Sequence, residues 1–159
     1  MRSLRTRHSR NRATGKRGEQ GQALAEFALV LPVLMVVTLG IIKGGLLYNN
    51  YLQLTDAVRS GARQFAVERG QAAPCTDAAA VVNSAAGGLN VSSISITMSE
   101  YPDPAPPDTY TTQNPSNCPA LTSGSAITLK ATYPCDLSIM GVVVIPNCTL
   151  SASATEQVE

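Results

Sequence analysis

The side chains that could carry chemistry in this chain are few, and their spacing limits what they can do. The 159-residue sequence has one histidine, His8, and four cysteines, none of them in a C-x-x-C pair: Cys75, Cys118, Cys135 and Cys148. A zinc site needs closely spaced Cys or His ligands, and a Ser-His or Cys-His nucleophile needs a nearby histidine. We therefore expect no metal site, no cofactor and no enzymatic activity.

Disulfides are the chemistry that the four cysteines favour. All four lie beyond an apolar run, on the side away from a basic N-terminal tail, where an oxidising compartment is expected. Four cysteines allow three pairings. We favour Cys135–Cys148, because each abuts the end of an expected strand and antiparallel pairing would bring those ends together. That leaves Cys75–Cys118, which would tie a proline-rich loop to the start of a short helix.

One acidic residue, Glu26, immediately precedes an apolar run, residues 27–42, that contains no charged residue. A buried carboxylate costs several kcal/mol unless a partner offsets it, so such residues are seldom incidental. The alternative is a Glu26 that sits at the membrane interface and is hydrated. Four acidic residues farther along lie near expected turns and should be solvated: Glu100, Asp103, Asp108 and Asp136.

The basic residues are concentrated at the N-terminus. Seven of the twelve Lys and Arg precede Gly18, and no acidic residue precedes Glu19. A basic tail can bind nucleic acid. Here it stops at the edge of an apolar run, where the positive-inside rule makes it a cytoplasmic anchor. We expect a single-pass protein of the cytoplasmic membrane with an extracytoplasmic C-terminal domain and no nucleic-acid partner.

The apolar run is long enough to cross a bilayer if Lys43 snorkels. Residues 27–48 then form a span in contact with lipid, with Tyr48 and Tyr51 at the far interface. A removable secretory signal is the alternative, but no A-x-A cleavage pattern follows Ile42. We therefore expect the span to stay in the mature protein.

A single helix over residues 22–68 should extend beyond the membrane. Its apolar residues recur at alternating spacings of four and three, which is one helical stripe: Leu47, Tyr51, Leu54, Val58, Gly61 and Phe65. Gly70 and Pro74 should end it. Gly40 and Gly44 form a G-x-x-x-G, which allows close approach of another helix or, alternatively, makes a flexible joint.

The remainder, residues 69–159, predicts a small extracytoplasmic domain, so the fold class is α+β. A short helix after Cys75 can be capped by Thr76 or Asp77 and stopped by Gly87 and Gly88. Alternating apolar and polar residues predict about three antiparallel strands, at 91–99, 125–133 and 149–159. A sheet that small needs the helix over one face.

The stretch from Gly21 through Gln22 and Glu26 to Phe27 resembles the processing site of type IV prepilins. The resemblance implies a basic leader, residues 1–21, that a prepilin peptidase removes by cutting after Gly21, with Glu26 as the fifth mature residue. The new amine of Gln22 could then pair with Glu26 of the same or a neighbouring helix, which would offset desolvation and fix register between subunits.

Three stretches are similar to the TadE-like family of the tight-adherence (Tad) pilus machinery: ALAEFALVLPVLMVVTLGI, DAVRSGARQFAV and LSASATEQVE. The resemblance implies a pseudopilin-like or minor-pilin role in building or anchoring a thin adhesive pilus. Its partners would be the peptidase and other pilus or pseudopilin subunits, bound through the N-terminal helix. The first alternative is the major filament subunit. The resemblance implies that major subunits of this pilus are much shorter than this chain, which argues against it. The second alternative is a tethered binding or enzymatic domain.

Overall fold

The computed structural model describes residues 15–101, 110–111, 118–139 and 141–159, with side chains from residue 21 onward. The chain divides into two compact units, residues Met1–Gly40 and Ile41–Glu159. One helix, α1 (Gly15–Val67), contributes to both.

In the first unit, the side chains of α1 beyond Glu26 are uncharged and mostly apolar. Leu24, Phe27, Leu29 and Val33 are all more than half exposed. Pro32 lies inside the helix and removes one backbone hydrogen bond. α1 between Gly21 and Val67 holds one candidate membrane span, by length and composition. An exposed surface of this kind is stable in lipid, which agrees with the span predicted from the sequence.

In the second unit, α1 carries the predicted stripe into a core. Leu54, Val58 and Phe65 are fully buried, with buried alanines beside them, whereas Tyr51 is 41% exposed. The stripe is therefore confirmed from Leu54 onward. The helix ends at Val67, close to Gly70, whose φ is +82°.

The second helix, α2 (Pro74–Ala85), starts differently from the prediction. Pro74 does not end the preceding helix but occupies the first turn of α2, where its missing N–H costs nothing. The N-cap is Ala73, without a side-chain hydrogen bond, so the proposed cap by Thr76 or Asp77 is wrong. The helix stops just before Gly87, as expected.

The main sheet has four antiparallel strands in the order β2-β1-β3-β6. They are β1 (Ser95–Tyr101), β2 (Tyr110–Thr111), β3 (Ala126–Pro134) and β6 (Thr149–Gln157). The last two confirm the prediction. β1 starts later than expected, because residues Val91–Ser93 form a 3-10 turn whose N-cap, Asn90, accepts a hydrogen bond from the Ser92 backbone N–H. β2 was not predicted; it is a short edge strand inside the proline-rich segment.

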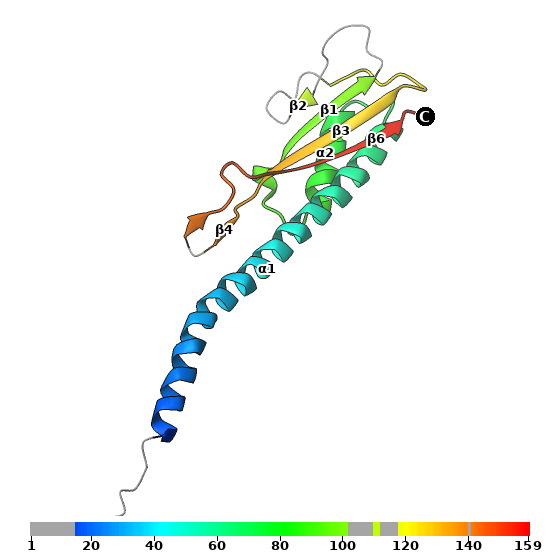
Figure 1. The fold of residues 1–159 in the computed structure, drawn as a ribbon. Helices are drawn as coiled ribbons and strands as arrows, with labels where there is room; N and C mark the ends of the chain where they lie inside the picture. The colour runs from blue at the N-terminus through cyan, green and yellow to red at the C-terminus, as the bar shows by residue number, and fades with distance from the viewer. Residues whose placement is uncertain (1–14, 102–109, 112–117, 140) are drawn as a thin grey trace, which may run out of the picture. The chain divides into compact units, whose positions relative to one another are not determined.

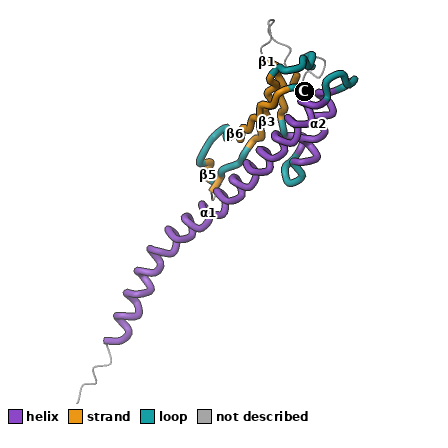
Figure 2. Tube along the Cα trace, turned by 90° about the vertical axis from the view of Figure 1, so that its right-hand side faces the viewer, coloured by secondary structure: helices purple, strands orange, loops and turns teal. Residues whose placement is uncertain are grey.

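Both helices cover one face of this sheet (Figure 2). Alternate residues of the strands point into the layer between, and they bury Ile96 and Met98 from β1 and Ile127 and Leu129 from β3. On the opposite face the hydroxyls of Thr128 and Thr155 hydrogen-bond at 2.9 Å. The sheet therefore has one buried and one solvated face, as its alternating sequence predicted.

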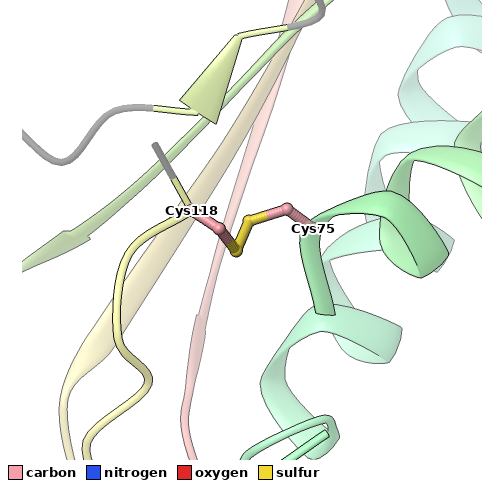
Figure 3. Close-up of a disulfide and its surroundings, with 2 residues drawn as sticks. All are labelled: Cys75 and Cys118. Carbon is pink, nitrogen blue, oxygen red and sulfur yellow. A yellow bond between two sulfur atoms is a disulfide. The ribbon is translucent and has the colours of Figure 1, made fainter. Parts of the chain in front are cut away.

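Two disulfides join the cysteines in the pairing that the sequence favoured. Cys75–Cys118 connects the start of α2 to the segment before β3 (Figure 3), and Cys135–Cys148 connects the end of β3 to the start of β6. The Cys135 backbone N–H also donates to the Cys148 carbonyl at 3.0 Å.

The segment inside the second disulfide is a hairpin rather than a plain connection. Its strands are β4 (Ser138–Ile139) and β5 (Val142–Val143), and the Val144 backbone N–H donates to the Leu137 carbonyl at 2.9 Å. Gly141, with φ of +81°, is in the turn between the strands. Such a turn needs a residue that accepts positive φ, which glycine does without strain.

Candidate processing and assembly site

The expected processing residues, 21–27, all lie on α1. The Gln22 side-chain amide donates to the Glu26 carboxylate, with an Nε2–Oε1 distance of 3.2 Å. This contact follows from the spacing of four residues, which places both side chains on one helical face. Both side chains are exposed within the first unit.

Gly21 leaves the helix surface open at the bond where cleavage is expected. A Cβ built at Gly21 would meet no atom within 4 Å. Because α1 begins at Gly15, the helix already includes the end of the leader expected over residues 1–21. The bond after Gly21 is therefore inside a helix in this structure, and Glu26 lies one turn farther on.

The span beyond Glu26 carries an apolar surface that a neighbouring helix could contact. Pro32, Val33, Val36 and Val37 line an open apolar hollow of about 310 Å³. The second glycine of the G-x-x-x-G pattern, Gly44, is also open, since no atom lies within 4 Å of a Cβ built there. In lipid, close helix contacts form over small residues and shape-matched grooves rather than by hydrophobic exclusion.

Glu100 is not simply solvated, as the sequence suggested, but holds a loop to the sheet. Its carboxylate accepts hydrogen bonds from the Thr122 backbone N–H at 2.9 Å, the Thr122 hydroxyl at 2.6 Å and the Ser125 hydroxyl. Partial burial disfavours the charged form, but these three donors outweigh it and hold the pKa of Glu100 below its ordinary value of 4.5. The partners are more than twenty residues away, so no local sequence pattern indicates them.

Several candidate residues lie elsewhere. His8, the basic residues before residue 15, Asp103 and Asp108 are outside the described residues. Asp136 is exposed and accepts a hydrogen bond from the Ser138 hydroxyl at 3.2 Å. Among the residues that the structure describes, no group of three His, Cys, Asp or Glu side chains could hold a metal ion.

Comparison with known proteins finds a likeness within the long helix α1. A family model described as TadE-like protein matches residues 21–63. Most of the long helix α1 is therefore similar to that family. The match starts at Gly21, includes Glu26 and continues beyond the span into the part of α1 that packs on the sheet. No curated protein and no solved structure matches the chain.

The chain is therefore similar to TadE-like proteins along the helix that holds its candidate membrane span. Its candidate span and its antiparallel sheet domain agree with the α+β, single-pass architecture expected from the sequence. The sheet domain, with both disulfides, lies outside the matched segment. Sequence reasoning missed the hydrogen bonds of Glu100 and the exposed aliphatic residues of the β4–β5 hairpin.

Proposed function

We propose that this protein is a non-catalytic, pseudopilin-like or minor-pilin-like component that a prepilin peptidase processes after Gly21 and that then takes part in Tad pilus assembly. The observation that carries the proposal is the TadE-like match starting at Gly21, with Glu26 in the place where a processed subunit needs its carboxylate. The single histidine of the sequence, His8, would leave with the leader, which argues against His-dependent catalysis by the mature chain.

Glu26 is the residue to which we assign assembly. A helical side chain leans toward the N-terminus, so the Glu26 carboxylate points back to the turn that holds Gln22. The 3.2 Å contact between the two side chains supports this direction. Cleavage would place a positive amine on Gln22 within the same turn. In lipid, an amine and a carboxylate each need a partner, and a pair formed between neighbouring helices would set their register.

The orientation that we propose keeps the N-terminus in the cytoplasm and the sheet domain outside the cytoplasmic membrane. Seven basic residues before Gly18 support it, because positive flanks are retained on the cytoplasmic side. Two disulfides in the sheet domain support it as well, because such bonds persist in oxidising compartments.

The test of processing is N-terminal sequencing of the membrane-extracted protein in cells with and without the peptidase. The mature chain should begin at Gln22, and replacing Gly21 by a bulky residue should leave the precursor uncut. A mature chain that begins at Met1 would contradict the proposal, as would one that begins beyond Ile42.

The test of assembly is Glu26→Gln, which keeps the size of the side chain and removes its charge. The variant should insert and be cleaved largely as the wild type, but it should reduce pilus formation and co-purification of partner subunits. Asp56→Asn, which removes an exposed carboxylate from the same helix, is the matched control. A fully piliated Glu26→Gln strain would instead favour a hydrated Glu26, since an exposed pair contributes only about 0–1 kcal/mol.

A further inference from the structure

The β4–β5 hairpin exposes a contiguous aliphatic patch that the folded domain leaves uncovered. Four consecutive side chains form it, with exposed fractions from 67% to 48%: Val142, Val143, Val144 and Ile145. Elsewhere in the described sheet domain, large exposed apolar residues such as Val91 and Tyr101 stand singly. Single exposed apolar residues are normal, whereas a contiguous patch indicates a contact surface.

The hairpin is a closed structure rather than a loose loop. The Cys135–Cys148 disulfide and the Cys135–Cys148 backbone hydrogen bond join its two ends, and Ser138 and Ile139 pair with Val143 and Val142. The sequence has no charged residue from 137 to 147. The disulfide and the strand pairing therefore fix the position of the patch, and the segment that carries it has no charged side chain.

The root of the hairpin lies beside the part of α1 where the span is expected to leave the bilayer. Lys43, Leu47 and Asn50 of α1 line a hollow of about 300 Å³ together with Tyr133, Cys135 and Asp136 at the end of β3. The ribbon in Figure 1 and the tube in Figure 2 both place the hairpin at this end of the sheet. On the same stretch of α1, Tyr48 is 63% exposed, as a ring at the headgroup level would be.

We propose that the aliphatic patch of residues 142–145 docks into the surface of the same bilayer that α1 spans. The occupant is lipid because the patch is uncharged and aliphatic, and because the root of its hairpin lies beside the stretch of α1 where the span is expected to leave the bilayer. Docking is shallow, at the boundary between headgroups and acyl chains. A two-stranded hairpin keeps outer backbone groups unpaired, and these need water or headgroups as partners. The domain is then attached to the membrane at two points, which restricts its rotation about the helix axis.

The chain has no tryptophan, so one introduced tryptophan reports on its own surroundings. The full chain carrying Val143→Trp is reconstituted into phosphatidylcholine vesicles, with and without bromine on the acyl chains near the headgroup. The matched control is Tyr101→Trp. Tyr101 is 73% exposed and pairs with Ala126, at the opposite end of β3 from the hairpin.

Val143→Trp should emit at shorter wavelength than Tyr101→Trp and should be quenched by the brominated lipid, whereas Tyr101→Trp should not be quenched. Adding Val142→Asp and Val144→Asp to Val143→Trp should abolish the quenching, with thiol titration verifying that both disulfides remain intact. Ile145→Trp provides a second probe of the same patch and should also be quenched.

Three results would overturn the proposal. Val143→Trp could be as solvent-exposed and unquenched as Tyr101→Trp. It could emit at short wavelength yet escape quenching, which would indicate burial against a second copy of the protein. Both probes could be quenched alike, which would mean that the hairpin has no special contact with lipid. None of these measurements depends on pilus assembly, so failure here leaves the proposed function standing.

Discussion

Replacing Gly61 by alanine should destabilise the sheet domain, although alanine is the better helix former. Gly61 is buried on α1 and faces Ala78 and Val82 of α2. A Cβ added there would lie 2.3 Å from Cγ2 of Val82, 3.2 Å from Cδ1 of Leu129 and 3.3 Å from the Ala78 carbonyl oxygen. An ordinary contact at such a position is 3.4–4 Å. The two helices must therefore move apart, or Val82 must leave its place.

Two opposing terms set the magnitude of this effect. Alanine gains about 1 kcal/mol over glycine in a helix interior. Overpacking a well-packed core costs about 1–3 kcal/mol. Val82 is fully buried and β-branched, so it has little freedom to turn away, and the upper half of that range applies. We expect a net loss of about 1–2 kcal/mol, and a domain of this size loses about 4–8 °C of melting temperature per kcal/mol.

The assay is thermal unfolding of the full chain in detergent, followed by the near-ultraviolet circular dichroism of its tyrosines with the disulfides intact. Gly45→Ala is the matched control on the same helix, because no atom lies within 4 Å of a Cβ at Gly45. It should leave the melting temperature of the sheet domain unchanged. In the Gly61→Ala background, Val82→Ala should cost less than it does alone, because the two positions are coupled. A Gly61→Ala protein as stable as the wild type would refute the reasoning, since helix propensity would then outweigh the contact.

Three further predictions concern the sheet domain. Glu100→Gln should lower stability at pH 7 by about 1 kcal/mol, because charge-assisted hydrogen bonds from Thr122 and Ser125 become neutral ones and the site is partly exposed. Folding lowers the pKa of Glu100, so its contribution to stability is present above the ordinary value of 4.5 and is lost as the pH falls through the folded pKa. In urea titrations, the stability difference between the wild type and Glu100→Gln should therefore shrink below pH 4.5. A stability difference that stays constant with pH would contradict this. Replacing both cysteines by serine should cost about 4 kcal/mol for the Cys75–Cys118 pair, which closes 43 residues, and about 3 kcal/mol for the Cys135–Cys148 pair, which closes 13. If chemical unfolding showed equal losses of stability for the two pairs, or a larger loss for Cys135–Cys148, loop-closure entropy would not be the main source of the stabilisation. A membrane-impermeant thiol reagent should label Cys135 and Cys148, which are partly exposed, in spheroplasts only after reduction. Labelling without reductant would contradict the disulfide, and protection of both thiols after reduction would contradict the orientation.

The sequence by itself determined the long helix, its candidate span and its resemblance to a prepilin processing site, because these depend on residues that are close along the chain. The apolar run, the spacing of Gly21 and Glu26, and the stripe through Leu54, Val58 and Phe65 are all periodic or local signals. β3 and β6 were predictable for the same reason, since alternation in one strand shows which face is buried. The pairing of the cysteines followed from the places of those strand ends.

Only the tertiary structure decided the features that depend on residues far apart in the sequence. The donors to Glu100 on β1 are Thr122 and Ser125, which lie in the loop that precedes the neighbouring strand β3. The need for glycine at residue 61 arises from Val82 on another helix. The sequence of the β4–β5 hairpin is apolar in the middle and indicated only a connection between two strands. Its exposure follows from the disulfide and the sheet register, which place both ends at the edge of the core and leave Val142 to Ile145 outside it.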